Sequence, residues 1–93
     1  MLETEPFDPA KYLESPEAQK ELLDDALESG EASYVAHALG IIARAKGMTD
    51  VARSANVTRE ALYKSLSLDG DPRLSTLLGV TRALGYKLTA RTA

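Results

Sequence analysis

The stretch from Met48 to Leu66 contains two short helical patterns separated by one sharp break. The first pattern includes Thr49, whose hydroxyl predicts the N-cap of a helix over residues 49–55. The break falls at Asn56, a residue type that adopts the left-handed backbone conformation more readily than most non-glycine residues. Thr58 predicts the N-cap of a second helix that continues to Leu66. Two such short helices restrict the chain to a small helical fold in which other elements cover their apolar sides.

The second of these helices has one apolar side and one polar side. At about 100° per residue, Leu62 and Leu66 share the side that faces the core, with Ala61 and Ser65 at its margin. The opposite side is polar and carries Glu60, Tyr63, Lys64 and Ser67, with Arg59 on the flank and Thr58 at the tip. A tight turn that lifts a polar helix off the domain is typical of a helix-turn-helix, whose second helix enters the major groove of DNA. The alternative is an ordinary helical hairpin inside a bundle, which does not need an outward side of this composition.

The chemistry of this polar side predicts contacts with DNA. Arg59 suits bidentate recognition of guanine, and Glu60 suits the amino group of cytosine. Hydroxyl-bearing side chains such as Tyr63 suit phosphate oxygens or a thymine methyl group, and basic side chains such as Lys64 suit phosphates. The predicted DNA-contacting residues are Thr49, Arg53, Thr58, Arg59, Glu60, Tyr63, Lys64, Ser67 and Arg73.

An acidic helix precedes this region. Ser15 and Pro16 predict its start, and Gly30 predicts its end. One stripe along this helix is acidic and consists of Glu17, Glu21, Asp24, Asp25 and Glu28. The stripe is either a solvated surface or a docking surface for a basic partner. Residues 33–46 predict a second, more buried helix that ends at Gly47.

The C-terminal part combines a helix with an alternating tail. Ser75 predicts the N-cap of a helix that ends at Gly85, and Gly79 inside it indicates close approach of another backbone. The final residues YKLTARTA alternate in the manner of a strand, with Tyr86, Leu88 and Ala90 on one side. Because no second strand is evident in the chain, we expect this edge to pair with a partner chain, either a second copy through those three residues or another protein. The alternative is a frayed tail.

Length and composition indicate one small domain. The chain has 93 residues, so we expect an extended arm over residues 1–15 and a single all-α domain over residues 16–93, with the helix-turn-helix over residues 48–67. A domain of this size buries only about 60% of its unfolded surface, which favours a homodimer. The net charge is −3, yet residues 1–47 carry four basic against ten acidic side chains, and residues 48–93 carry seven against four. The second half is therefore the part suited to nucleic acid.

Several function classes are disfavoured by what the sequence contains. It has no cysteine and a single histidine, and its carboxylates are spread along a helix, so we expect no enzyme, no metal site and no cofactor. No apolar run approaches the roughly 20 residues that span a bilayer, and no secretion leader is evident, so we expect a cytoplasmic protein without a membrane partner.

These features together resemble a known family. The segments ARAKGM, TREALYKSL and DGDPRLSTLL, preceded by the acidic leader FDPAKYLESPEAQKELLDDALESGEASYVAHALG, are similar to the addiction module antidote proteins. These are HigA-like antitoxins of type II toxin-antitoxin systems with an XRE-type helix-turn-helix. The resemblance implies a homodimer that neutralises a small basic RelE/ParE-like toxin and binds operator DNA to repress its own operon. It maps the DNA-reading helix to residues 58–67.

The sequence departs from the family pattern at three positions, where Asn56 and Gly79 replace more usual residues and Asp50 stands where a phosphate-contacting glutamine is common. An acid at position 50 would weaken DNA affinity. The predicted toxin-binding residues are Phe7, Tyr12, Leu13, Glu17, Glu21, Asp24, Asp25 and Glu28, because aromatic anchors and an acidic stripe complement a basic surface. Two other functions stay open, namely a stand-alone, prophage-like repressor without a toxin and a helical interaction module that does not bind DNA.

Overall fold

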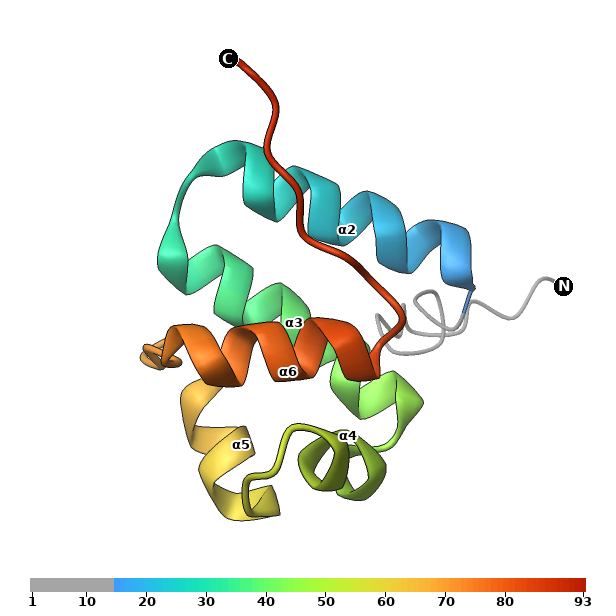
Figure 1. Cartoon of the computed structure of the whole chain (residues 1–93), viewed down its shortest axis with the longest axis vertical. Helices are drawn as coiled ribbons and strands as arrows, with labels where there is room; N and C mark the ends of the chain where they lie inside the picture. Colours follow the sequence, from blue (N-terminus) through green and yellow to red (C-terminus); the bar gives the residue numbers. More distant parts are fainter. Residues whose placement is uncertain (1–14) are drawn as a thin grey trace, which may run out of the picture.

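The computed structural model describes residues 15–93, so nearly all of the predicted arm lies outside the described residues. Within residues 15–93 the fold is all-helical and contains no strand, which confirms the predicted all-α class. The helices are α2 (Pro16–Ser29), α3 (Ala32–Lys46), α4 (Met48–Ser54), α5 (Arg59–Ser65) and α6 (Leu74–Ala83). In Figure 1, α2 and α3 form one layer, α6 crosses in front of α3, and α4 and α5 lie below them.

The boundaries of α2 follow the signals in its sequence. Ser15 has an extended backbone, and its hydroxyl accepts a hydrogen bond of 3.1 Å from the backbone N–H of Ala18. Gly30 ends the helix in the left-handed conformation with φ 71°, where glycine avoids the strain that a Cβ would cause. Both predictions for this helix are confirmed.

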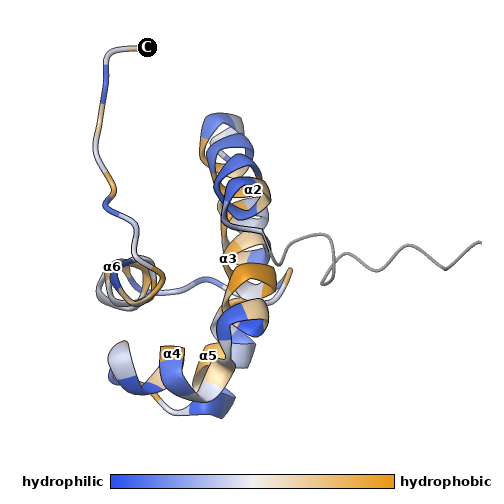
Figure 2. Cartoon of the chain, turned by 90° about the vertical axis from the view of Figure 1, so that its right-hand side faces the viewer, coloured by the Kyte–Doolittle hydropathy of each residue, from blue (hydrophilic) through white to orange (hydrophobic). Residues whose placement is uncertain are grey.

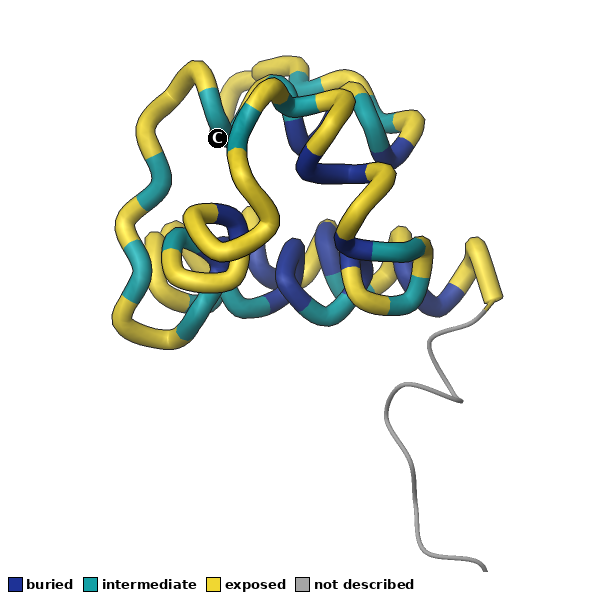
Figure 3. The backbone as a smooth tube through the Cα atoms, turned by 90° about the horizontal axis from the view of Figure 1, so that it is seen from below, coloured by how far each residue is buried: buried dark blue, intermediate teal, exposed yellow. Residues whose placement is uncertain are grey.

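The core is centred on α3. The largest fully buried side chains come from α3, from α5 with the turn after it, and from α6, and they are Leu39, Ile42, Leu62, Leu66 and Val80. Leu23 of α2 and Val51 of α4 complete the cluster from either side. Figure 3 shows the same pattern along the backbone, with buried segments on the inner sides of the helices. Leu62 and Leu66 belong to this core, so α5 packs on the rest of the domain through its apolar side.

The link between α4 and α5 is the turn expected from the sequence. Asn56 has φ 59°, and it is the single non-glycine residue with positive φ among residues 15–93. Val57 is half-buried against the core, and its backbone N–H donates to the carbonyl oxygen of Ala52 at 3.0 Å. The left-handed Asn56 therefore reverses the chain while the residue after it returns to the core, as predicted.

The predicted N-caps of α4 and α6 are each wrong by two residues. The first turn of α4 begins at Met48, with Gly47 at the N-cap, because Met48 is buried and is already part of the helix that packs on the core. Thr49 is consequently an exposed residue inside α4. Helix α6 begins at Leu74 after the extended residue Arg73, so Ser75 lies inside the helix and caps nothing.

Gly79 has the close neighbour that its position predicted. A Cβ at residue 79 would lie 3.2 Å from Cα of Ala55, which is tighter than ordinary van der Waals contact. The missing side chain lets α6 approach the end of α4, and this approach outweighs the low helix propensity of glycine.

The C-terminal residues 86–93 form no strand, contrary to the expected strand periodicity, since no strand is available for pairing within residues 15–93. The tail runs in an extended path across α2 (Figure 1). Its first side chains nevertheless alternate, because Tyr86 and Leu88 are half-buried while Lys87 is exposed. The backbone N–H of Tyr86 donates to the carbonyl oxygen of Thr81 at 2.8 Å, which fixes the start of the tail at the end of α6.

Candidate functional site

The polar side of α5 is exposed as the sequence predicts. Thr58 caps the helix, and its hydroxyl accepts a hydrogen bond of 3.1 Å from the backbone N–H of Ala61. Beyond the cap, Arg59, Glu60, Tyr63 and Lys64 are exposed, while Leu62 and Leu66 on the opposite side are buried. The helix thus presents two basic groups, one acid and one phenol to solvent on a rigid support.

Arg59 contacts two other side chains on this surface. Its Nη1 donates to the hydroxyl of Thr49 at 3.3 Å, and its Nη2 donates to the hydroxyl of Tyr63 at 3.4 Å. The guanidinium carbon also lies 5.5 Å from the centre of the Tyr63 ring, within the range of a cation–π contact. These contacts join the start of α4 to α5 and reduce the freedom of a long side chain.

The other residues predicted to contact DNA are less closely joined to this cluster. Arg53 forms an exposed ion pair of 3.8 Å with Asp50. Ser67 is half-buried, and its hydroxyl donates to the carbonyl oxygen of Lys64 at 2.9 Å within the same segment. Arg73 is exposed at the N-cap of α6 and has no ion pair among residues 15–93. The structure therefore brings Thr49, Arg59 and Tyr63 together and leaves the phosphate candidates separate.

The acidic stripe of α2 consists of Glu17, Glu21, Asp24, Asp25 and Glu28, and all five residues are exposed. Figure 2 shows hydrophilic residues along α2. Asp24 forms an ion pair of 2.6 Å with Lys20, which lies one turn earlier in α2. Glu28 forms an ion pair of 3.3 Å with Arg91 of the tail. Asp25 accepts a hydrogen bond of 2.5 Å from the hydroxyl of Tyr34. Glu17 and Glu21 have no such partner within residues 15–93.

Two of these contacts raise the pKa of the side chain that donates the hydrogen bond. The hydrogen bond from Tyr34 to Asp25 raises the pKa of the phenol, and the hydrogen bond and charge of Asp24 raise the pKa of Lys20. The partners of the stripe, Lys20, Tyr34 and Arg91, are not among the residues predicted from the sequence. The Lys20 contact follows from the spacing of four residues on a helix. The contacts of Tyr34 and Arg91 join different elements, so no local pattern indicates them.

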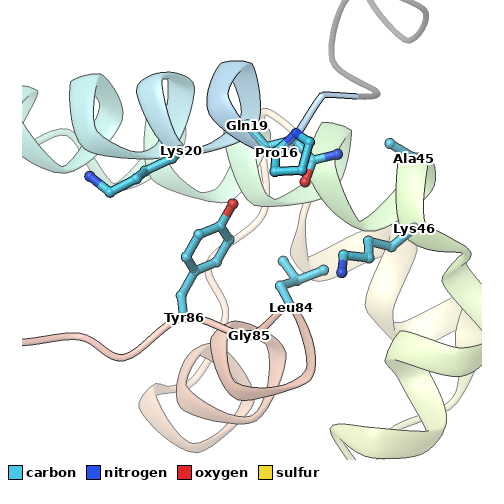
Figure 4. A pocket seen from close by; sticks show the side chains of 8 residues that line it. All are labelled: Pro16, Gln19, Lys20, Ala45, Lys46, Leu84, Gly85 and Tyr86. Carbon is cyan, nitrogen blue, oxygen red and sulfur yellow. The ribbon is translucent and has the colours of Figure 1, made fainter.

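The tail residues predicted for dimerisation differ in their surroundings. Tyr86 packs against the core, and burial raises the pKa of its phenol; Leu88 is half-buried and Ala90 is exposed. Tyr86 also lines an open hollow of ≈ 450 Å³ that lies between the start of α2, the end of α3 and the residues after α6. The ring of Tyr86 points toward α2 beside Lys20 (Figure 4). A second hollow of ≈ 570 Å³ lies between the tail and α2, and Leu27 is one of the residues that line it.

The predicted arm contacts Phe7, Tyr12 and Leu13 lie outside the described residues. In residues 15–93 no group of three or more acidic, histidine or cysteine side chains is arranged to hold a metal ion. No helix in the described part of the chain is long and apolar enough to cross a bilayer.

Comparison with known proteins identifies the family. Residues 3–92 match a family described as "Probable addiction module antidote protein". An uncharacterized protein of Haemophilus influenzae is 40% identical over 81 residues, which cover 87% of this chain and 84% of that protein. No solved structure matches the chain. The family match extends over nearly the whole sequence and includes both the acidic α2 and the α4–α5 pair, so the chain belongs to the family of probable addiction module antidote proteins.

Proposed function

We propose that this protein is the antitoxin of a type II toxin-antitoxin module, with two binding activities and no catalytic one. It neutralises a small basic RelE/ParE-like toxin by direct contact, and it represses its own operon through a HigA-like, XRE-type helix-turn-helix formed by α4 and α5. It acts in the cytoplasm as a homodimer and needs no cofactor. The observation that carries the DNA-binding part is the exposed polar side of α5, on which Arg59 is held by Thr49 and Tyr63.

In this proposal α5 enters the major groove of operator DNA. A groove of this width admits one helix, and α5 packs on the core through Leu62 and Leu66, so its outward side is free to approach base edges. Arg59 then donates two parallel hydrogen bonds to one guanine, an arrangement that requires a fixed guanidinium plane. Glu60 accepts from a cytosine amino group, while Thr58 and Tyr63 reach phosphate or a thymine methyl group.

Phosphate contacts supply the sequence-independent part of the affinity. Lys64, Arg53 and Arg73 are all exposed and suit this role, since each phosphate contact releases counterions. In the free protein the ion pair with Arg53 partly neutralises Asp50, an acid that would otherwise repel DNA. This ion pair must open when Arg53 turns toward a phosphate. Affinity should therefore depend strongly on salt concentration.

Membership of an antidote family implies a toxin partner, and α2 is the surface we assign to it. Five carboxylates on one exposed stripe attract a basic protein and speed its association. Glu17 and Glu21 are immediately available, because they have no partner within residues 15–93, whereas Glu28 must first exchange Arg91 for a basic group of the toxin. Phe7, Tyr12 and Leu13 of the arm would add apolar anchors for the toxin.

Co-expression with the product of the adjacent gene tests the toxin part. We expect a small basic protein to co-purify, and we expect Glu17→Lys combined with Glu21→Lys to weaken its capture at least tenfold at low salt, where charge pairs contribute most (an order-of-magnitude estimate). Glu31→Lys combined with Glu60→Lys is the matched control, because it makes the same change in charge at exposed positions outside the stripe.

The outcomes separate the candidate functions. Equal capture by the two double variants would remove the stripe from the toxin interface. No binding to the neighbouring product, together with intact operator binding, would favour a stand-alone repressor. Toxin capture without any salt-dependent binding to operator DNA would leave an antidote that is not a repressor.

A further inference from the structure

The C-terminal tail, residues 86–93, is anchored at its start. Tyr86 packs against the core, and its backbone N–H donates to the carbonyl oxygen of Thr81 at 2.8 Å. Beyond this anchor, residues 87–93 cross α2 in an extended path (Figure 1) without a backbone hydrogen bond to any part of residues 15–93. Side chains alone therefore hold this later part of the tail on α2.

The side-chain contacts beyond Tyr86 are weak. Arg91 forms its ion pair of 3.3 Å with Glu28, but the two side chains are 87% and 76% exposed, so water and salt weaken their attraction. Leu88 is half-buried and lines the hollow of ≈ 570 Å³ that remains between the tail and α2, so these two segments are less closely packed than a protein core. Residues 87–93 can therefore detach at a small cost in free energy while Tyr86 stays in place.

The part of α2 beside the tail has the composition of a protein contact. Leu27 lines the hollow and is 41% exposed even with the tail in place, and the carboxylates of Asp24 and Glu28 line it as well. In protein interfaces an apolar side chain is typically buried at the centre, and polar or charged groups form the rim. Both carboxylates belong to the acidic stripe that we assign to the toxin. In the free protein Arg91 therefore holds the position on Glu28 that a basic group of the toxin would take.

We propose that residues 87–93 are an autoinhibitory strap, which covers the later part of the α2 stripe in the free protein and is displaced when the basic toxin binds. This inference rests on the proposed function, which assigns α2 to the toxin, and it adds the device that controls access to that surface. Displacement exchanges Arg91 for a basic group of the toxin on Glu28, and it lets an apolar side chain of the toxin cover Leu27. Opening of the strap opposes binding, so the toxin binds more weakly than it would to an uncovered α2.

Surface plasmon resonance of the full chain with the purified product of the adjacent gene tests the strap. Leu88→Ser combined with Arg91→Ser removes both side-chain contacts of the strap. This variant should lower the dissociation constant about fivefold, because an exposed ion pair and a half-buried leucine hold the closed state only weakly. The matched control, Leu68→Ser combined with Arg82→Ser, makes the same two changes at exposed positions outside α2 and the tail, and should bind like the wild type.

The outcomes distinguish the strap from the proposed function. Equal dissociation constants for the strap variant and the control would overturn the strap and leave the assignment of α2 to the toxin intact. Weaker binding by the strap variant than by the control would also overturn the strap, since the tail would then contribute to the interface. No binding of the adjacent product to the wild type, the strap variant or the control would contradict the proposed function itself, and the strap with it.

A spin label on the tail detects its release directly. The chain has no cysteine, so Ala90→Cys gives a single site for a nitroxide, and Ser75→Cys on α6 gives the control site. At residue 90 the electron paramagnetic resonance spectrum should narrow when Leu88→Ser and Arg91→Ser are added to the free protein, and again when the adjacent gene product binds the wild-type tail. The spectrum at residue 75 should not narrow in either case. A spectrum at residue 90 that stays the same in the free variant, or that broadens relative to residue 75 on binding, would overturn the strap.

Discussion

The carbonyl oxygen of Leu66 lies so close to Gly40 that a Cβ at residue 40 would be 2.5 Å from it. Gly40 is in the middle of α3, and Leu66 follows the last turn of α5, so this contact sets how closely α5 packs on the central helix. The same Cβ would lie 3.3 Å from the Cβ of Leu66. The position of the proposed DNA-reading helix therefore depends on the absence of one side chain.

Substitution of this glycine should destabilise the protein despite the better helix propensity of alanine. We expect Gly40→Ala to lower the free energy of unfolding by about 2 kcal/mol, because backbone atoms must move to relieve the overlap and this outweighs a propensity gain of about 1 kcal/mol. Gly79→Ala is the control, since its new Cβ would meet Ala55 at the milder distance of 3.2 Å. Urea unfolding should find a smaller loss of unfolding free energy for Gly79→Ala. Equal losses would show that the packing around Gly40 has room for a methyl group.

Asn56 stores a small amount of backbone strain at the turn between α4 and α5. Because its φ is 59°, Asn56→Gly should raise the free energy of unfolding slightly or leave it unchanged, while Asn56→Ala should lower it by about 1 kcal/mol. Thermal unfolding of the three proteins measures the order. If alanine were as stable as asparagine, the turn would not require a residue suited to the left-handed conformation.

Substitutions at Thr58 and Ser75 test which of the two hydroxyl side chains caps a helix. Thr58 accepts from the backbone N–H of Ala61, so Thr58→Ala should cost about 1 kcal/mol of stability. Ser75 lies inside α6 and caps nothing, so Ser75→Ala should cost less than about 0.5 kcal/mol or stabilise the helix slightly. Denaturant unfolding of both variants distinguishes the observed cap from the one that sequence alone predicts. The reverse order would contradict the boundaries described for α5 and α6.

The contact between Tyr34 and Asp25 makes stability depend on pH in the alkaline range. The hydrogen bond to Asp25 raises the pKa of Tyr34 above 10.0, so the folded state holds the phenol proton more tightly than the unfolded state does. The stabilisation is complete below the unfolded pKa and is lost as pH rises through the folded pKa. Tyr34→Phe should therefore lose less stability than the wild type as the pH rises from below 10.0 to above it.

Absorbance titration of the phenols supplies an independent check of this contact. Asp25→Asn removes the charged acceptor, so the pKa of Tyr34 should fall back toward its ordinary value of 10.0. A titration curve identical to that of the wild type would mean that Asp25 does not hold the Tyr34 proton.

Local patterns in the sequence predict much of the fold and of the α5 surface. The caps at Ser15 and Thr58, the turn at Asn56 and the buried side with Leu62 all depend on neighbours within four residues, which sequence spacing displays directly. The caps expected at Thr49 and Ser75 failed because core packing and the preceding backbone start those helices earlier.

Contacts between distant elements lie beyond such reasoning. The partners of the acidic stripe include Tyr34, nine residues after Asp25, and Arg91, which is 63 residues after Glu28. The sequence around Leu74 is apolar and does not indicate that this side chain is exposed. Leu74 is uncovered because α6 lies at the edge of the molecule (Figure 2). These features arise from the arrangement of helices and not from the periodicity of any one of them.

Binding of the chain to its own promoter region, measured by fluorescence anisotropy at about 0.15 M salt, tests the central claim that α5 reads DNA. Arg59→Ala combined with Lys64→Ala should weaken binding about 100-fold, because one bidentate base contact and one phosphate contact are lost from each copy. The control, Lys87→Ala combined with Arg91→Ala, removes the same charge from the exposed tail and should bind within about threefold of the wild type. Equal binding by the wild type and the Arg59–Lys64 variant would contradict the account.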